Sequence, residues 1–136
     1  MKITVEAKIN APLEKVWSAW TTPEDITKWN FASDDWCCPS AEMDLKTGGK
    51  FKSRMESKDG STGFEFEGTF TSVKEFESIE YKMGGGREVS VSFSKTDKGT
   101  FVTETFDAEN TYSPEYQKHG WQSILNNFSK YVESKK

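Results

Sequence analysis

The C-terminal segment of the sequence constrains the fold most, because it predicts one long amphipathic helix over Ser113–Lys136. Ser113 is a good helix cap, and Pro114 suits the first helical position, where its missing N–H has no partner. The apolar residues recur at helical spacing and form a single stripe: Trp121, Ile124, Leu125, Phe128 and Val132. A helix of this length with one apolar side needs a broad partner surface.

The upstream sequence supplies that surface, because it alternates between apolar and polar residues in several short runs. Lys2–Ile9 alternates strictly and predicts a half-buried strand. Helical spacing follows, with Pro12 and Pro23 at the starts of two short helices. Residues 30–39 are predicted to form a loop that holds Trp36, Cys37 and Cys38. From Ser40 onward, turn residues separate six further alternating runs.

This element order predicts an α+β fold in one domain, residues 1–136. Hairpin connections make the sheet antiparallel, and the alternation leaves one face of each strand apolar. We therefore expect a seven-stranded curved antiparallel sheet wrapped around the long C-terminal helix, with two short helices after the first strand. Gly68, which lies among phenylalanines in a long strand, predicts a bend or bulge there.

Charge and cysteine content exclude several classes of function. The formal net charge is −4 and there is no run of basic residues, which argues against nucleic acid and anionic membranes as partners. The sequence has no transmembrane stretch and no signal-peptide core, so we expect a cytoplasmic protein. Cys37 and Cys38 are the two cysteines, too few for a structural zinc site, and we expect reduced thiols with no metal and no cofactor.

Several local motifs occur together in one order along nearly the whole chain. They are Ala11-Pro12-Leu13-Glu14-Lys15-Val16-Trp17, Thr22-Pro23-Glu24 through Trp29, Gly48-Gly49-Lys50-Phe51, Asp59-Gly60, Gly68, and Gly120-Trp121 followed by Leu125 and Phe128. In this order and spacing the sequence resembles the START-like, Bet v-type helix-grip (SRPBCC) superfamily. Within it, the sequence is similar to the family named after the activator of the heat-shock protein 90 ATPase, here called Aha-type.

The resemblance implies a helix-grip fold, and many superfamily relatives hold an apolar ligand between the helix and the sheet. The family name implies a chaperone partner and a link to stress response. The eukaryotic co-chaperone carries a separate N-terminal domain, whereas this sequence begins at the first strand of the Aha-type unit. We therefore expect weak or no stimulation of a chaperone ATPase by this chain. The superfamily also includes cyclases and dehydratases.

Two polar residues are candidates for the interior. If Val102 and Phe106 face the core, period two also places Glu104 inside, where burial would raise its pKa. The opposite parity would turn Glu104 outward. Gln117 lies one turn before Trp121 on the inner face of the helix, where it could bind a ligand or Glu104, or simply sit at the solvated end of the helix. His119, the one histidine, falls on the outer face, and no catalytic residue is assigned.

The aromatic residues give the main functional hypothesis. The residues predicted to line a ligand cavity are Trp36, Phe51, Phe64, Phe66, Glu104, Phe106, Gln117, Trp121 and Phe128. They either enclose such a cavity or simply fill the core, and Asp34 and Asp35 are expected to be solvated loop acids. The leading hypothesis is a protein, monomeric or homodimeric, that binds a small apolar or aromatic ligand. The alternatives are a co-chaperone-like interaction module and an enzyme that uses Glu104 as acid or base.

Overall fold

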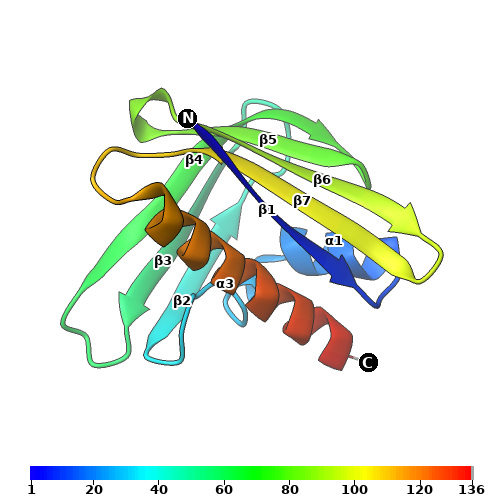
Figure 1. Ribbon diagram of the computed structural model, residues 1–136, viewed down its shortest axis with the longest axis horizontal. Coiled ribbons are helices and arrows are strands. Elements are labelled where there is room, and N and C mark those ends of the chain that lie inside the picture. Colours follow the sequence, from blue (N-terminus) through cyan, green and yellow to red (C-terminus); the bar gives the residue numbers. More distant parts are fainter. Residues whose placement is uncertain (136) are drawn as a thin grey trace.

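Residues 1–135, which the computed structural model describes, form a seven-stranded antiparallel sheet, two short α-helices, one 3-10 turn and a long C-terminal α-helix (Figure 1). Along the sheet the strands follow the order β1-β7-β6-β5-β4-β3-β2. The elements are β1 (Lys2–Ile9), α1 (Leu13–Thr21), α2 (Pro23–Ile26), β2 (Trp36–Met43), β3 (Lys50–Ser57), β4 (Gly63–Lys74), β5 (Ser78–Met83), the turn η1 (Gly84–Gly86), β6 (Glu88–Thr96), β7 (Gly99–Asp107) and α3 (Pro114–Ser134). The predicted helix-grip fold class is confirmed.

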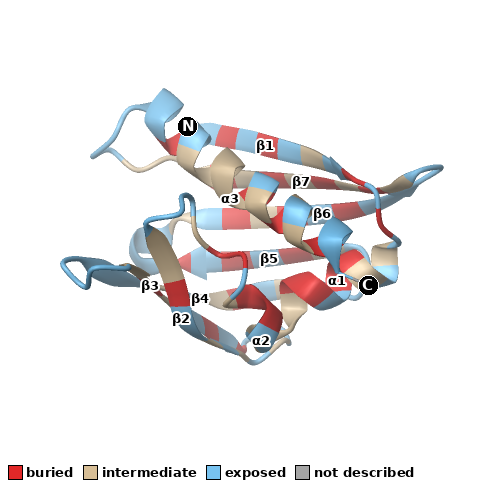
Figure 2. Ribbon diagram, turned by 90° about the horizontal axis from the view of Figure 1, so that it is seen from below, coloured by how far each residue is buried: buried red, intermediate tan, exposed pale blue. Residues whose placement is uncertain are grey.

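Helix α3 begins and packs as its sequence predicts. The Ser113 hydroxyl accepts a hydrogen bond from the Tyr116 backbone N–H at 3.1 Å, which caps the helix. Figure 2 shows α3 lying across one face of the sheet. The buried residues of the helix are Gln117, Leu125, Phe128 and Val132. The outer face is exposed at the positions expected from helical phase, His119 included.

Side chains of α3 also form hydrogen bonds with backbone groups at the free edge of β1 and in the residue that follows it. The Gln122 amide donates to the Glu6 carbonyl oxygen at 3.0 Å, and the Asn10 backbone N–H donates to the Glu133 carboxylate at 2.8 Å. An edge strand otherwise presents unpaired backbone groups. The helix therefore closes one end of the sheet as well as covering its inner face.

An aromatic cluster fills the space between the C-terminal half of α3 and the two short helices. The Phe128 ring lies 4.9 Å from Trp20 and 4.7 Å from Trp29, measured between ring centroids, in edge-to-face contacts. Trp20 also contacts Phe93 of β6 at 5.8 Å, and the Trp29 indole N–H donates to the Ala19 carbonyl. This end of the core is packed, with Phe128 fully buried.

Strand β2 differs from the sequence-based prediction, because it begins at Trp36 rather than Ser40. Cys37 and Cys38 therefore lie in a strand and not in a loop. The register against β3 shifts between Cys37 and Ser40, where one extra residue forms a bulge next to Pro39. The bulge interrupts the alternation of apolar and polar residues, which is why the sequence pattern hides the first half of the strand.

Gly68 does not lie at a bulge, so the bulge expected there from the sequence is absent. It pairs regularly with Phe51 on β3 and Met83 on β5, and the irregularity of β4 lies between Phe70 and Ser72. A Cβ atom at Gly68 would lie 2.6 Å from the Lys82 carbonyl oxygen and 2.9 Å from the Phe51 ring. Glycine is needed here because the Phe51 ring packs directly over the backbone of β4.

Asp25 ties α2 to the end of α3. Its carboxylate accepts hydrogen bonds from the Tyr131 hydroxyl and from the Lys135 ammonium, the latter at 2.9 Å. Burial acts to raise the pKa of Asp25, but the hydrogen bonds from Lys135 and Tyr131 outweigh burial and hold that pKa below 3.8. The ionised form of Asp25 therefore stabilises the fold.

We expect Asp25→Asn to lower the unfolding free energy at neutral pH by about 1–3 kcal/mol, the usual range for hydrogen bonds to charged groups. The folded-state pKa is depressed, so the contribution is complete above pH 3.8 and is lost as pH falls below it. Urea melts of both proteins should therefore differ at pH ~7 and converge near pH ~2. Asp97→Asn in the exposed β6–β7 turn is the matched control. Equal stability of Asp25→Asn and wild type at neutral pH would contradict this role.

Candidate functional site

Glu104 faces the interior of the fold. On β7 its neighbours on the same face are Val102 and Phe106, both fully buried, and Glu104 itself is only 6% exposed. The register places it between Val5 on β1 and Val91 on β6. The inward orientation predicted from period two is confirmed, and an acid stands among apolar side chains on the concave face of the sheet.

The Glu104 carboxyl group has no hydrogen-bond partner among residues 1–135. Burial is the cause that raises its pKa from 4.5 to about 8, since removal from water disfavours the charged form. Within the same residues, no side-chain nitrogen or oxygen is both sealed from solvent and unpartnered. The Glu104 oxygens therefore keep some contact with solvent.

Tyr81 is the second polar side chain on this part of the inner face, and the sequence analysis did not select it. It extends from β5, is 6% exposed, and its ring lies 4.7 Å from Phe51 and 6.3 Å from Phe66. Burial first, and the negative charge of Glu104 second, raise the pKa of the Tyr81 hydroxyl, against a smaller opposing effect of Arg87. The signal that could have identified it is the alternation that places Ile79, Tyr81 and Met83 on one face.

Four of the predicted lining residues form a continuous chain of aromatic contacts around these polar groups. The Trp121 ring stacks on Phe106 with centroids 3.9 Å apart and an interplanar angle of 11°. Trp121 also lies 6.1 Å from Phe66, which lies 5.8 Å from Phe51. With Tyr81 these rings form what we call the inner aromatic wall: Phe51, Phe66, Tyr81, Phe106 and Trp121. The wall connects β7, α3 and the β3–β5 half of the sheet.

The remaining predicted residues lie apart from Glu104 or are engaged elsewhere. Phe128 belongs to the packed cluster with Trp20 and Trp29. Trp36 and Phe64 contact each other at 6.0 Å at the rim, where Phe64 is 48% exposed.

Gln117 is buried on the inner face, as one of the two interpretations of its position required, but it does not bind Glu104. Its amide donates to the carbonyl oxygens of Glu109 and Tyr112 and accepts from the Glu109 N–H, at 2.8–3.0 Å. All of these contacts hold the loop before α3. The alternative contact with Glu104 is absent because the backbone of this loop already satisfies the Gln117 amide, and a contact of Gln117 with a ligand stays a prediction.

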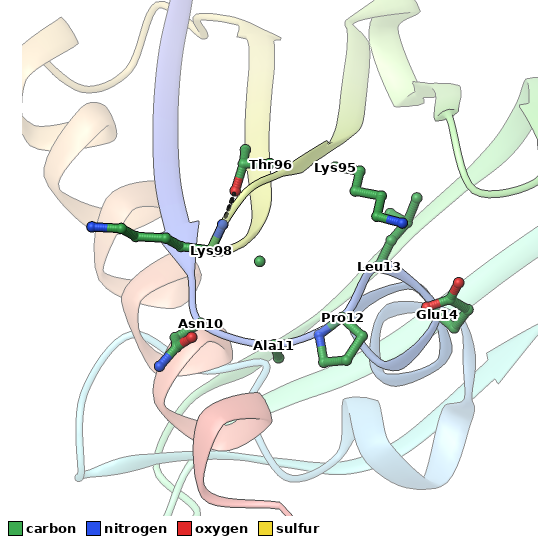
Figure 3. Close-up of a pocket in the computed structure, with 9 residues that line it drawn as sticks. Asn10, Ala11, Pro12, Leu13, Glu14, Lys95, Thr96 and Lys98 are labelled. Atoms are coloured by element: carbon green, nitrogen blue, oxygen red, sulfur yellow. Dashed lines mark hydrogen bonds between the residues drawn. The ribbon is translucent and has the colours of Figure 1, made fainter.

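Two surface hollows lie away from the inner aromatic wall. The first, about 340 Å³, lies between the β1–α1 connection and the β6–β7 hairpin. Figure 3 shows its lining, which consists of residues 10–14 together with Lys95, Thr96, Lys98 and Gly99. The second, about 380 Å³, separates residues 31–34 from the outer face of α3. None of the nine predicted cavity residues lines either hollow. A ligand bound beside Glu104 would therefore occupy neither of these two hollows.

The two thiols have different environments. Cys38 is 2% exposed, and burial, followed by the charge of Cys37, raises its pKa to about 11, against hydrogen bonding from Ser40, Ser53 and Asn30. Cys37 is only half-buried. Within residues 1–135 no cluster of three or more histidine, cysteine or acidic side chains could hold a metal ion.

We expect Cys37 to react with a thiol reagent such as 5,5′-dithiobis(2-nitrobenzoate) at pH ~8, and Cys38 to react at least about tenfold more slowly, because thiolate fraction and exposure control the rate. Cys37→Ala and Cys38→Ala assign the two phases. Denaturation should release the slow thiol. Equal rates for both thiols in the folded protein would mean that Cys38 is not enclosed by the bulge of β2.

No helix within residues 1–135 has the length and apolar character needed to cross a membrane.

Comparisons with known proteins agree with this geometry. The sequence model of the family described as "Activator of Hsp90 ATPase homolog 1-like protein" matches residues 10–133. The solution structure of an AHSA1-like protein from Aeromonas hydrophila is 48% identical, with a TM-score of 0.93 over 98% of this chain and 93% of that one. A protein from Cytophaga hutchinsonii is 47% identical, with a TM-score of 0.84 over 97% and 92% of the two chains. A Nitrosomonas europaea protein shares the fold at 20% identity, with a TM-score of 0.85 over 100% and 96%. No curated protein matches the sequence.

Proposed function

Because the chain belongs to the family of Activator of Hsp90 ATPase homolog 1-like proteins, we propose that it uses its helix-grip fold to bind a small apolar or aromatic molecule between α3 and the sheet. The observation that carries the proposal is Glu104, an inward acid beside the inner aromatic wall that is 6% exposed and has no hydrogen-bond partner among residues 1–135. Buried polar groups in folded proteins nearly always have a hydrogen-bond partner, and exceptions are frequent at functional sites. A bound molecule would supply that partner.

The packing of α3 supports a site that opens at one side. The α3 backbone lies close to β1 and α1, whereas ring contacts such as Trp121 to Phe66 connect it to β4. Rotation of a side chain such as Trp121, which is only half-buried, could therefore widen the space above Glu104 without moving the helix. Trp36 and Phe64 form an apolar rim on the same side. Apolar walls with a few polar groups are the usual composition of ligand sites.

We expect the protein to bind the neutral fluorescent probe N-phenyl-1-naphthylamine saturably, with fluorescence enhancement of the probe and quenching of tryptophan. Phe66→Ala, in the inner aromatic wall, should change the affinity by about fivefold or more, equivalent to about 1 kcal/mol. Phe101→Ala is the matched control, because Phe101 is a half-buried phenylalanine on the opposite face of the sheet. Absence of saturable binding by wild type, or equal effects of the two variants, would remove the proposal.

A co-chaperone-like interaction module is the second candidate, and the family description is the observation in its favour. Such a module needs an apolar docking surface. The large hydrophobic residues that are more than a third exposed within residues 1–135 all lie off the outer face of the sheet: Met1, Phe64, Phe76, Tyr112 and Tyr116. Several-fold stimulation of a heat-shock protein 90 ATPase at stoichiometric concentration would favour this candidate.

Acid or base catalysis by Glu104 would require the same opening as ligand binding, so probe binding is the earlier test. We place the protein in the cytoplasm, where both cysteines remain thiols.

A further inference from the structure

Glu104 and Tyr81 are two buried polar side chains on the inner face of neighbouring parts of the sheet, each 6% exposed. Tyr81 pairs with Val89 on β6, Val89 pairs with Phe106 on β7, and Glu104 lies two residues before Phe106 on the same face. The chemistry of these two groups restricts the ligand. We infer that the ligand is an organic cation, an amine on an apolar or aromatic skeleton, whose ammonium group binds between the Glu104 carboxylate and the Tyr81 hydroxyl. The inference rests on the proposed function and adds the charge and the orientation of the bound molecule. Tyr81 becomes a second ligand-binding residue beside Glu104.

No lysine, arginine or histidine among residues 1–135 forms a salt bridge with Glu104. Arg87 is the cation whose charge reaches this region, and its guanidinium donates to the Glu109 carboxylate at 3.2 Å. Arg87 acts to lower the pKa of Tyr81, whereas burial raises the pKa of Glu104. Sealing an ionised carboxylate under an apolar ligand without a counter-charge would be very unfavourable. A ligand that carries its own positive charge removes that penalty.

The surrounding rings favour the same class of ligand. Tyr81 lies within aromatic contact of Phe51, Phe66 and Phe70, and Phe66 in turn contacts Trp121. Aromatic rings attract ammonium groups through their π faces, and a carboxylate among such rings is the usual composition of amine-binding sites. An ammonium group has three donors, so it can bind both the Glu104 carboxylate and the phenolic oxygen of Tyr81. The net charge of −4 also favours the approach of cations.

A neutral carbonyl ligand is the competing chemistry, because protonated Glu104 and Tyr81 could both donate to it. A glutamine or serine side chain could donate a hydrogen bond to a carbonyl oxygen equally well, without the free-energy cost of burying an ionisable acid. The two chemistries also differ in pH dependence. As pH rises through about 8 Glu104 ionises, so amine affinity should rise and carbonyl affinity should fall.

Few other groups can produce this pH dependence. The neighbours of Glu104 on β1 and β6 are Val5 and Val91. The inward positions of β3 and β4 carry no ionisable side chain: Phe51, Ser53, Met55, Phe64 and Phe66. The inner face of α3 carries Gln117, Trp121, Ile124, Leu125 and Phe128, none of which titrates. Burial raises the pKa of Tyr81 well above 10, outside this interval.

Isothermal titration calorimetry with 2-phenylethylamine, 2-phenylethanol and acetophenone tests the inference, since the three molecules have similar skeletons and differ in the polar group. At pH ~8.5 the wild type should bind the amine about tenfold more tightly than the alcohol, the gain expected for a charge-assisted hydrogen bond. Between pH ~6 and pH ~8.5 the amine affinity should increase at least about fivefold, because Glu104 ionises in this interval while the amine stays charged.

Two variants make the test specific. Glu104→Gln should abolish both the preference for the amine and its pH dependence, whereas the outer-face control Phe101→Ala should keep both. Tyr81→Phe should weaken amine binding about threefold to tenfold and leave the pH dependence in place. Equal binding of amine and alcohol, or tighter binding of acetophenone that weakens as pH rises, would overturn the inference while the proposed function stands. If the naphthylamine probe does not bind either, both fail.

Discussion

Wild-type protein should lose about 3–5 kcal/mol of unfolding free energy between pH 4.5 and pH ~8, and Glu104→Gln should remove most of that loss. The pKa of Glu104 is 4.5 in the unfolded chain and about 8 in the folded protein. Between these values the unfolded state releases a proton that the folded state retains, so stability falls as pH rises. Below 4.5 both states are protonated and the effect is absent.

Urea melts at several pH values between ~4.5 and ~8.5 measure this effect. The glutamine variant should match wild type at the acid end and exceed it at the alkaline end. Glu80→Gln is the control, because Glu80 is exposed on the same sheet and faces outward. The contribution of Asp25 changes below pH 3.8, outside this window. Parallel profiles for wild type and Glu104→Gln would mean that the acid is well hydrated in the folded protein and that its pKa is not raised by burial.

Phe128→Ala should cost about 3–5 kcal/mol of unfolding free energy, the usual range for a buried phenylalanine. Phe128 is fully buried, and its ring packs edge-to-face on Trp20 and Trp29. Its loss would leave a cavity where α3, α1 and the chain after α2 meet. Since domains of this kind have about 5–15 kcal/mol in total, the variant should be strongly destabilised.

Trp121→Ala is the matched comparison, because it lies two turns earlier on the same stripe. Trp121 is half-buried, with one ring face stacked on Phe106, so its loss should cost less than that of Phe128. Guanidinium melts of the two variants give the order directly. If Trp121→Ala were the more destabilising, the N-terminal half of α3 would be the tighter part of the core, and a site there would be hard to open.

The features that depend on local pattern were predictable. The cap at Ser113 and the stripe from Trp121 to Val132 define α3 without reference to the rest of the chain. Strict alternation defines strands such as β1 at their observed limits. The β2 bulge was not predictable, because an extra residue breaks the two-residue alternation by which a strand is identified in a sequence. The role of Gly68 was also hidden, since it depends on the ring of Phe51 from a neighbouring strand.

The site was predictable only in part, for the same physical reason. Parity along β7 placed Glu104 inside, but its nearness to Tyr81 depends on sheet curvature and side-chain length across separate strands. Gln117 was placed on the correct face, yet its amide binds a loop whose path no periodicity encodes. Whether rings leave or fill a space depends on rotamers and volumes, which sequence pattern does not specify.

The pairing of Gln122 with Glu6 and of Glu133 with Asn10 has a consequence for how the protein avoids polymerisation. A sheet of this order has two ends at which a foreign strand could add, and α3 blocks the one at β1. At the other end, β2 carries a bulge beside Pro39, and proline offers no N–H to an incoming strand. Lifting α3 as a rigid body would expose the β1 edge as a template for strand addition. Access to the interior by rotation of Trp121 keeps that edge covered throughout.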